Sequence, residues 1–384
     1  MTKSTMARRF AFPAGRRLLP LVLVVMAIGA DAADFSLRLI GQQTIATGTL
    51  VGDVEFGGIS GVDRASDGSF WAISDDRGGE RGAPRFYRLI MTYDSSGFHG
   101  ITISQQIRMQ QPDGSDFTAT SRTVDPEGIR VAPNGNLYWS SEGIWHSDPA
   151  RHYQPFVREM DANGRFVREF VTPPLYHYAD GAATGGRDNK LFEALAVAPG
   201  GMIFVANEDA LIQDGNISSP NAGSFIRVTA LDPISGNPVA QYAYRLPPIP
   251  MAGVAGPGRA DNGLSELLAI SETRFIAVER AYVPGAGNII RLVLSGIEVD
   301  TTDVADIPSL ASSDFNPMSR EQLLEMPLEY QGIKLDNIEA ISWGDALPNG
   351  NRTLVLVSDN NFSTSQVSQF IAFELVPAAQ TSGR

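Results

Sequence analysis

The chain has 384 residues, with 30 Lys plus Arg against 43 Asp plus Glu, and its formal net charge is −13 at pH 7. This negative charge argues against nucleic acid and against an anionic membrane surface as partners. The sequence contains no cysteine, which excludes disulfides, thiolate metal sites and cysteine nucleophiles, so stability has to come from the hydrophobic core.

Residues 1–32 have the features of a secretory signal peptide. A basic start over residues 8–17 precedes the apolar run 18–28, and Ala30-Asp31-Ala32 forms a small-x-small cleavage site. The apolar run is shorter than the about 20 residues of a membrane-spanning helix, and an uncleaved anchor is the alternative. Cleavage leaves a net charge near −17. We therefore expect a periplasmic or extracellular protein with no stable membrane insertion once the signal is removed.

The mature chain is expected to form a single domain over residues 33–378, followed by a flexible tail at 379–384. Its first predicted strand, Phe35 to Ile45, lies outside the repeats described next. Its last predicted strand, Gln369 to Leu375, is a suitable partner for the first. We predict that the two strands pair, because pairing would remove exposed sheet edges.

A β-hairpin recurs five times along the chain. Each copy has a short apolar strand, a turn of Asn, Asp, Gly or Pro, and a second strand rich in β-branched and aromatic residues. The copies span residues 56–79, 125–142, 191–209, 263–280 and 336–360. Further strand pairs with hairpin turns follow the first three copies, for example around Asp161-Ala162-Asn163-Gly164.

Four strands per unit are typical of a β-propeller blade, so the predicted fold is an all-β propeller. Five repeat units are detected, and five to seven blades remain open. The units are longer than a minimal blade of roughly 40 to 50 residues, which predicts long decorating loops over 145–154, 175–190, 247–262 and 301–336. Within the last loop, Ser319–Met326 is the only good helix candidate.

Acidic residues recur at both ends of the hairpins. The first strand opens on Glu127, Glu193, Glu266 and Glu339, with Gly57 at this position in the earliest copy, and intervals of 70, 66, 73 and 73 residues separate the five. The second strand closes on Asp75 or Asp76, Glu142, Glu208, Glu279 and Asp359. If equivalent strand ends point the same way, up to ten carboxylates gather in one place.

The glutamates that open the strands, the acids that close them and the segment Ser74-Asp75-Asp76-Arg77-Gly78 resemble the phytase-like ("esterase-like activity of phytase") family of secreted bacterial β-propellers. The resemblance covers nearly all of the mature chain. It implies a propeller in which the recurring acids form a phosphoesterase site that acts on a small phosphorylated substrate. The chain departs from the pattern at Gly57, which puts a fully symmetric ring of acids in doubt.

Crowded carboxylates need either protons or a cation. Oxygen ligands with neighbouring Asn207, Asn337 and Asn360 suit Ca²⁺, whereas four histidines at unrepeated positions argue against a zinc triad. We predict metal ligands at Asp75, Asp76, Glu142, Glu208, Glu279 and Asp359. We predict catalytic roles for Glu127, Glu193, Glu266, Glu339, Arg77 and Arg280. The two arginines would hold the phosphate, with help from Arg187, Lys190 and Lys334.

The sequence thus predicts a secreted, calcium-dependent phosphoesterase that hydrolyses phosphomonoesters or phosphodiesters on the propeller axis. Two alternatives stay open. The first is a non-catalytic binding or structural propeller fastened by calcium, since acids at strand ends also pair with arginines of neighbouring blades. The second is a lactonase-type, metal-dependent propeller hydrolase. These possibilities differ at the metal, because an enzyme keeps a ligand position open on it.

Overall fold

The computed structural model describes residues 35–76, 79, 81–119, 122–179, 183–250 and 260–378. The predicted signal peptide (1–32), the predicted tail (379–384) and Arg77 lie outside these residues. The described part has no α-helix and only four single-turn 3₁₀ helices, η2 (Pro149–Arg151), η3 (Pro174–Tyr176), η4 (Ile212–Asp214) and η5 (Leu310–Ser312). None of its helices is long and apolar enough to span a membrane.

Twenty strands form five antiparallel four-stranded sheets, which are the blades of a propeller. The innermost strands, from blade 1 to blade 5, are β4 (Ile59–Arg64), β8 (Pro126–Val131), β12 (Phe192–Val197), β16 (Asp261–Ala269) and β22 (Asn337–Trp343). The second strands are β5 (Phe70–Ser74), β9 (Leu137–Ser141), β13 (Ile203–Asn207), β17 (Arg274–Val283) and β23 (Thr353–Asp359). The third strands are β6 (Arg85–Asp94), β10 (Phe156–Met160), β14 (Ser224–Leu231), β18 (Gly287–Gly296) and β24 (Val367–Pro377). The outermost strands are β7 (Gly97–Arg108), β11 (Phe166–Glu169), β15 (Pro238–Leu246), β19 (Ser319–Met326) and β1 (Phe35–Ala46).

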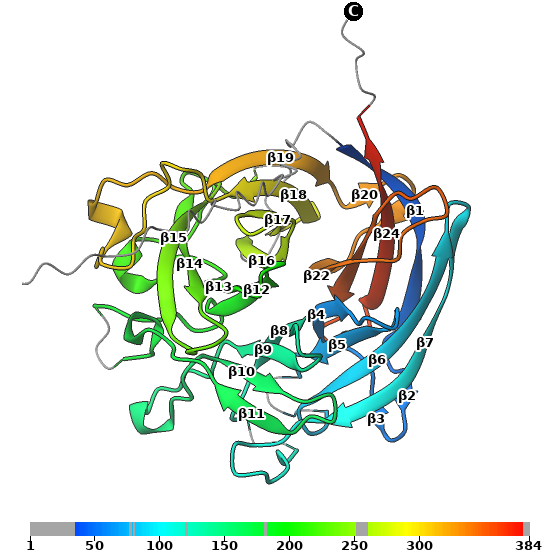
Figure 1. The fold of residues 1–384 in the computed structure, drawn as a ribbon, viewed down its shortest axis with the longest axis horizontal. Helices are drawn as coiled ribbons and strands as arrows, with labels where there is room; N and C mark the ends of the chain where they lie inside the picture. Colours follow the sequence, from blue (N-terminus) through cyan, green and yellow to red (C-terminus); the bar gives the residue numbers. More distant parts are fainter. Residues whose placement is uncertain are drawn as a thin grey trace, which may run out of the picture. The chain divides into compact units, whose positions relative to one another are not determined.

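The blades surround a central axis (Figure 1). Around this axis each innermost strand contacts those of both neighbouring blades, and β22 of blade 5 contacts β4 of blade 1. The predicted propeller is therefore confirmed, and its blade number is five. Two short hairpins decorate it, one of β2 (Leu50–Val51) and β3 (Val54–Glu55), the other of β20 (Glu329–Tyr330) and β21 (Ile333–Lys334).

Blade 5 combines the two ends of the described chain. Its outermost strand β1 pairs antiparallel with β24, from Phe35 opposite Pro377 to Ala46 opposite Val367. The predicted pairing of the first and last strands is therefore confirmed. It closes the ring with main-chain hydrogen bonds and covers a sheet edge that would otherwise be exposed.

The hydrophobic core is divided into clusters that lie between neighbouring blades. One cluster joins blades 3 and 4, where Ala194, Ala196 and Ala206 pack with Phe204 and Phe275. Small residues near the axis let the innermost strands approach closely, while larger ones fill the wider space farther out. A Cβ added to Gly128 of β8, for example, would lie 2.5 Å from the Cβ of Leu195 in β12.

Residues Ser319–Met326, for which the sequence predicted a helix, form the strand β19 instead. This strand pairs with β18 from Gly296 opposite Ser319 to Ile290 opposite Met326. Its Glu, Gln, Leu and Met residues favour a helix by less than 1 kcal/mol each, roughly, and that preference is overridden by pairing with a blade that lacks its fourth strand.

Candidate functional site

Each innermost strand carries a β-bulge close to its start. In β12, Phe192 pairs with Asn207 and Ala194 with Ala206, so Glu193 is left without a cross-strand partner. The corresponding bulge residues of blades 1 to 5 are Ser60, Glu127, Glu193, Ser265 and Glu339. We call this the bulge position. A bulge re-aims a side chain relative to the regular pleat, and here it does so at the same level of the ring in every blade.

A second set of equivalent residues lies on the second strands. In each blade, the residue before the bulge pairs with a residue near the end of the second strand. These partners are, in blades 1 to 5, Ser74, Ser141, Asn207, Glu279 and Ser358. We call the residue that follows the partner in sequence the exit position. The exit positions of blades 1 to 5 are Asp75, Glu142, Glu208, Arg280 and Asp359. Four blades therefore offer a carboxylate here and blade 4 offers a guanidinium.

These registers correct three sequence alignments. Ser60, not Gly57, is the counterpart of the glutamates in blade 1, and Ser265, not Glu266, is their counterpart in blade 4. Likewise Arg280, not Glu279, occupies the exit position of blade 4. Successive side chains of a strand point to opposite faces, so a shift of one residue sends the acid to another environment.

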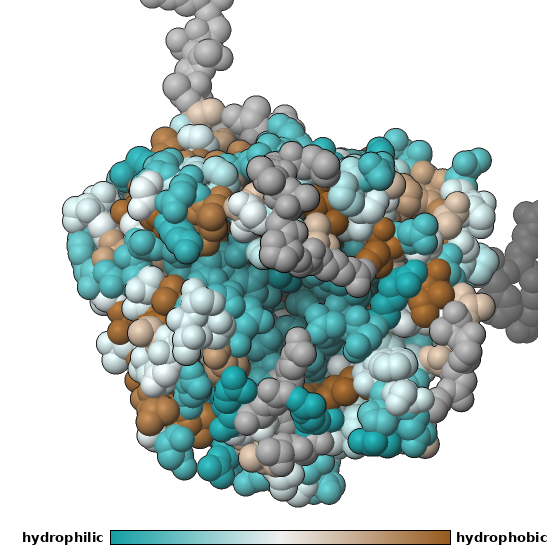
Figure 2. Space-filling view, turned by 180° about the vertical axis from the view of Figure 1, so that it is seen from behind, coloured by the Kyte–Doolittle hydropathy of each residue, from teal (hydrophilic) through white to brown (hydrophobic). Residues whose placement is uncertain are grey.

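Bulge or exit residues from each of the five blades line a cavity of about 600 Å³ at one mouth of the central channel, and Ser60, Glu208 and Ser265 are not part of this lining. Figure 2 shows a hollow lined by hydrophilic residues at the centre of one face of the propeller. The residues that line the cavity are likewise mostly polar or charged. The acids that line it are Asp75, Asp125, Glu127, Glu142, Glu193, Asp261, Asp336, Glu339 and Asp359, and its cations are Arg280 and Lys334. We call it the axial cavity.

Two groups of three carboxylates in this cavity have oxygen atoms within 4.8 Å of one another. The first group, Asp75, Glu339 and Asp359, brings together residues of blades 1 and 5, and the second, Asp125, Glu127 and Glu142, belongs to blade 2. Burial and the charges of Asp75 and Glu339 raise the pKa of Asp359 well above its usual value. Burial and Glu208 raise the pKa of Glu142 to about 8. Raised pKa values favour the protonated carboxyl unless a cation takes the place of the proton, so both groups fit a divalent metal ion.

The pKa values of Glu127 and Glu193 are also raised well above the ordinary value. Burial is the largest cause of the raised pKa at each, followed for Glu127 by the charge of Glu193 and for Glu193 by the charges of Glu208 and Glu142. Glu193 belongs to neither group of three carboxylates. Its protonated form is therefore a proton source in the cavity wall.

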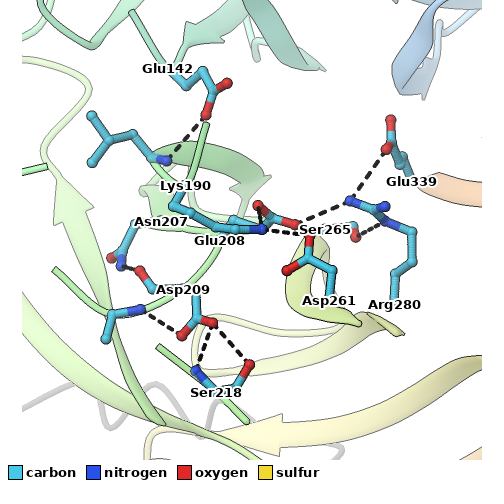
Figure 3. A network of polar contacts seen from close by, with 12 residues as sticks. Glu142, Lys190, Asn207, Glu208, Asp209, Ser218, Asp261, Ser265, Arg280 and Glu339 are labelled. Atoms are coloured by element: carbon cyan, nitrogen blue, oxygen red, sulfur yellow. Dashed lines mark hydrogen bonds and ion pairs between the residues drawn. The ribbon is translucent and has the colours of Figure 1, made fainter. Parts of the chain in front are cut away.

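The blade 3 and blade 4 side of the ring differs, because the chain supplies cations there (Figure 3). Lys190 donates to Glu208 at 2.6 Å and to Asp261 at 2.9 Å. Arg280 donates to Glu208 at 3.1 Å and to Asn337 at 2.8 Å. It also lies 3.4 Å from Glu339, which projects from blade 5 toward it.

These contacts keep the cations charged. Burial disfavours the charged forms, but the neighbouring carboxylates outweigh it and raise the pKa of both Lys190 and Arg280 above their usual values. Lys190 and Arg280 thus balance the charge of the Glu208 carboxylate from within the chain. Burial still raises the pKa of Glu208 above its ordinary value, against the lowering effect of these two cations.

Glu208, a predicted metal ligand, does not line the axial cavity, and three further predicted site residues also lie outside it. Asp76 accepts hydrogen bonds from Arg85 and from the backbone N–H groups of Arg81 and Gly82, and so anchors a loop. Glu279 of blade 4 accepts from the hydroxyl of Tyr244 in blade 3 at 2.5 Å and pairs with Arg320 of its own blade.

Glu266, the third of these residues, closes the channel behind the cavity. Its carboxylate lies 2.8 Å from Arg130 and accepts from the backbone N–H groups of Leu195 and Leu267. Arg130 in turn donates to the carbonyl oxygens of Val62, Leu195 and Leu267. The pair therefore joins the innermost strands of blades 1 to 4 across the axis, and we call it the channel plug.

Sequence reasoning missed the acids Asp125, Asp261 and Asp336 of the cavity lining. They precede the bulge positions of blades 2, 4 and 5 by two, four and three residues, respectively. A recurring acid just ahead of the repeated strand was therefore a signal in the sequence. The variable spacing hid it.

Solved structures that resemble this chain include a putative oxidoreductase (glucose dehydrogenase) from Thermus thermophilus, 11% identical with a TM-score of 0.35 over 89% of this chain and 100% of that one. A luciferin-regenerating enzyme is 10% identical with a TM-score of 0.36 over 87% and 94%. Virginiamycin B lyase from Staphylococcus aureus is 11% identical with a TM-score of 0.30 over 89% and 100%. Similarity this weak says nothing about the chemistry of the site.

No curated protein matches the sequence. The family model described as "Phytase-like: Esterase-like activity of phytase" matches residues 54–362, from before the first blade to the end of β23. That range includes every bulge and exit position, and it confirms the resemblance inferred from the recurring acids. The chain belongs to the phytase-like family.

Proposed function

We propose that the protein is a metal-dependent phosphoesterase, with calcium as the metal, that hydrolyses phosphomonoesters or phosphodiesters in the axial cavity. The observation that carries this proposal is the pair of three-carboxylate groups beside the guanidinium of Arg280 in one cavity. Membership of the phytase-like family supports it.

The donor set suits calcium, which takes six to eight oxygen ligands. Asp75, Glu339 and Asp359 would hold one ion, and Asp125, Glu127 and Glu142 would hold another. When bound, such an ion polarises a phosphoryl oxygen and lowers the pKa of a water ligand.

The remaining steps fall to the chain itself. Arg280 lines the cavity beside Glu339 of the first carboxylate group and attracts the anionic oxygens of a phosphate, with the exposed Lys334 as a second cation. Burial and the charges of Glu208 and Glu142 raise the pKa of Glu193, which favours its protonated form, and this form is suited to donate a proton to the leaving oxygen. The channel plug of Arg130 and Glu266 keeps the cavity closed at its base.

A second candidate function is a non-catalytic propeller in which the ion is structural. The observation that favours it is the composition of the first carboxylate group, whose Asp75 comes from blade 1 and whose Glu339 and Asp359 come from blade 5. An ion at this place would join the first and last blades, where the ring closes.

A substrate panel with matched variants tests the proposal. Purified protein is assayed against aryl phosphomonoester, phosphodiester, carboxyl ester and lactone substrates, in calcium and in chelator. The variants are Glu142→Gln, Asp359→Asn and, as control, Glu321→Gln on the outermost strand β19, where the side chain is exposed.

We expect calcium-dependent release of phosphate that Glu142→Gln and Asp359→Asn each reduce at least a hundredfold and that Glu321→Gln leaves unchanged. Hydrolysis of the lactone alone would replace the proposal with a lactonase. No turnover of any substrate, with a melting temperature that still rises on adding calcium, would establish the structural role instead.

A further inference from the structure

We propose that the opposite end of the propeller axis holds a second binding site, for a small molecule that joins an apolar body to an anionic group. A cavity of about 730 Å³ opens there. Its lining comes from the ends of the innermost strands and the turns that follow them in all five blades. We call it the distal cavity.

The distal cavity has the character of a small-molecule pocket. Val131, Val197 and Leu268 contribute apolar walls from blades 2, 3 and 4, and Pro133 and Pro199 stiffen the turns beside them. Pockets for small ligands have volumes of roughly 300–1,000 Å³ and predominantly apolar walls with a few fixed polar groups. The axial cavity, by contrast, is lined mainly by carboxylates.

The fixed polar group is Arg352 of blade 5. Its guanidinium lies 3.3 Å from the ring centroid of Trp343, which holds it by a cation–π contact. The ring itself is fixed, because the indole Nε1–H of Trp343 donates to the carbonyl oxygen of Ala269 at 3.0 Å. The carbonyl oxygen of Arg352 accepts from the N–H of Leu375 at 2.9 Å, which fixes its backbone.

The charges of the lining favour an anion. Of the three arginines that line the cavity, Arg130 pairs with Glu266 and Arg64 with Asp345. Within the described part of the chain no carboxylate pairs with Arg352. Asp63, the acid that lines the cavity, accepts from the N–H of Val131 and from the hydroxyl of Ser342. The cavity therefore presents one preorganised guanidinium without a counterion, beside apolar walls.

The two cavities are independent. Asn337 lines the axial cavity and Trp343 the distal one, and six residues of strand place them about 20 Å apart along β22. The channel plug lies between them. Occupation of the distal site should therefore depend neither on metal nor on the acids of the axial cavity.

Titration calorimetry on the whole protein tests the proposal with three probes: benzoate, which has both features, benzyl alcohol, which lacks the charge, and inorganic phosphate, which lacks the apolar body. The variants are Arg352→Gln, which removes the cation, and Ala346→Phe, which fills the cavity from an exposed position in its wall. The matched control is Arg88→Gln, since Arg88 also stacks on a tryptophan, Trp71, but is paired with Asp67 outside this cavity.

We expect saturable binding of benzoate that Arg352→Gln and Ala346→Phe each weaken at least tenfold, while Arg88→Gln, chelator and Asp359→Asn leave it unchanged. Benzyl alcohol and phosphate should bind at least tenfold more weakly than benzoate. The proposal is overturned if benzoate does not saturate, if Arg352→Gln has no effect, or if either single-feature probe binds equally well. Chelator and Asp359→Asn act on the axial cavity alone. If the protein proved not to be a phosphoesterase, the binding of benzoate in the distal cavity would therefore still be expected.

Discussion

Blade 4 differs from the other four blades in the charge that it places at the exit position. Blades 1, 2, 3 and 5 place a carboxylate at the exit position, and blade 4 places Arg280 there. Together with Lys190, Arg280 neutralises Glu208 within the chain. The groups Asp75, Glu339, Asp359 and Asp125, Glu127, Glu142 consist of acids alone. Burial and neighbouring acids raise the pKa of Glu127 and of Asp359 well above their ordinary values.

The two parts of the ring therefore differ in what they need to balance their charges on folding. A carboxylate that is paired with a cation of the same chain needs no metal ion to balance its charge. Crowded carboxylates without such a cation take up protons or an external metal ion. We call the surroundings of Lys190, Glu208 and Arg280 the cation sector, and the two groups of three carboxylates the acid sector. Four predictions follow from the contrast between them.

Loss of Arg280 should have the largest effect on stability. Arg280→Gln leaves Glu208 without its guanidinium and Glu339 without a nearby positive charge. Removing one partner of a buried ion pair typically costs about 3–5 kcal/mol. We expect a loss of this size in the free energy of unfolding, measured by urea denaturation in chelator. Adding Glu208→Gln to this variant should restore part of the loss, and a variant as stable as the parent would show that the cation sector is not held by Arg280.

Neutralising an acid should have opposite consequences in the two sectors. Glu208→Gln removes the charge that holds Lys190 and Arg280, so in chelator at pH 8 it should destabilise the protein by about 1–3 kcal/mol. Asp359→Asn removes a carboxyl whose charged form burial disfavours, and it keeps an oxygen that can accept from the N–H of Asn361.

We therefore expect the unfolding free energy of Asp359→Asn in chelator to be unchanged or higher. Its affinity for calcium, measured by calorimetry, should fall at least tenfold, while Glu208→Gln should retain calcium binding. Equal losses of unfolding free energy in the two variants would contradict the proposed difference between the sectors.

The pH dependence of stability should reveal the acid sector in the metal-free protein. Burial and Glu208 raise the pKa of Glu142 to about 8, and burial and Asp75 raise that of Glu339 to about 7 against the lowering effect of Arg280. Between about pH 4.5, the ordinary value, and these folded values, the native state binds more protons than the unfolded state, so the free energy of unfolding falls as pH rises.

We expect the melting temperature in chelator to drop by several degrees from pH 5 to pH 8, and calcium to remove most of this slope. Glu142→Gln should flatten the slope in chelator. A melting temperature that rises over this range without metal would contradict the raised pKa values.

The smallest effect is expected at Lys334, an exposed cation in the lining of the axial cavity. Lys334→Gln should leave the unfolding free energy within about 0.5 kcal/mol of the parent, because surface charges contribute little to stability. It should raise KM for a phosphate ester a few-fold with kcat unchanged, since it attracts the substrate without touching the reacting atoms. Arg245→Gln, on the outermost strand β15, is the control and should change neither constant.

The errors of the sequence alignment lie at the bulges. Equal spacing suggested that Gly57 and Glu266 correspond to Glu127, Glu193 and Glu339, but the pairing registers assign Ser60 and Ser265 instead. A bulge adds a residue to one strand without any signature in a single sequence, so the count drifts by one or more residues from copy to copy. That drift also assigned Glu279 to the cavity, where the structure has Arg280.

Sequence patterns alone were enough to predict the repeated hairpin, the propeller, its closure by the first and last strands, and a concentration of acids at the strand ends. These features follow from local patterns of apolar and turn residues that recur along the chain. The three-dimensional structure was needed to establish that there are five blades, that Ser319–Met326 is a strand, and which acids line the axial cavity. The structure also shows that Glu266 pairs with Arg130 in the channel plug. The physical reason is that strand register and the meeting of residues from different blades depend on long-range pairing, which no single repeat encodes.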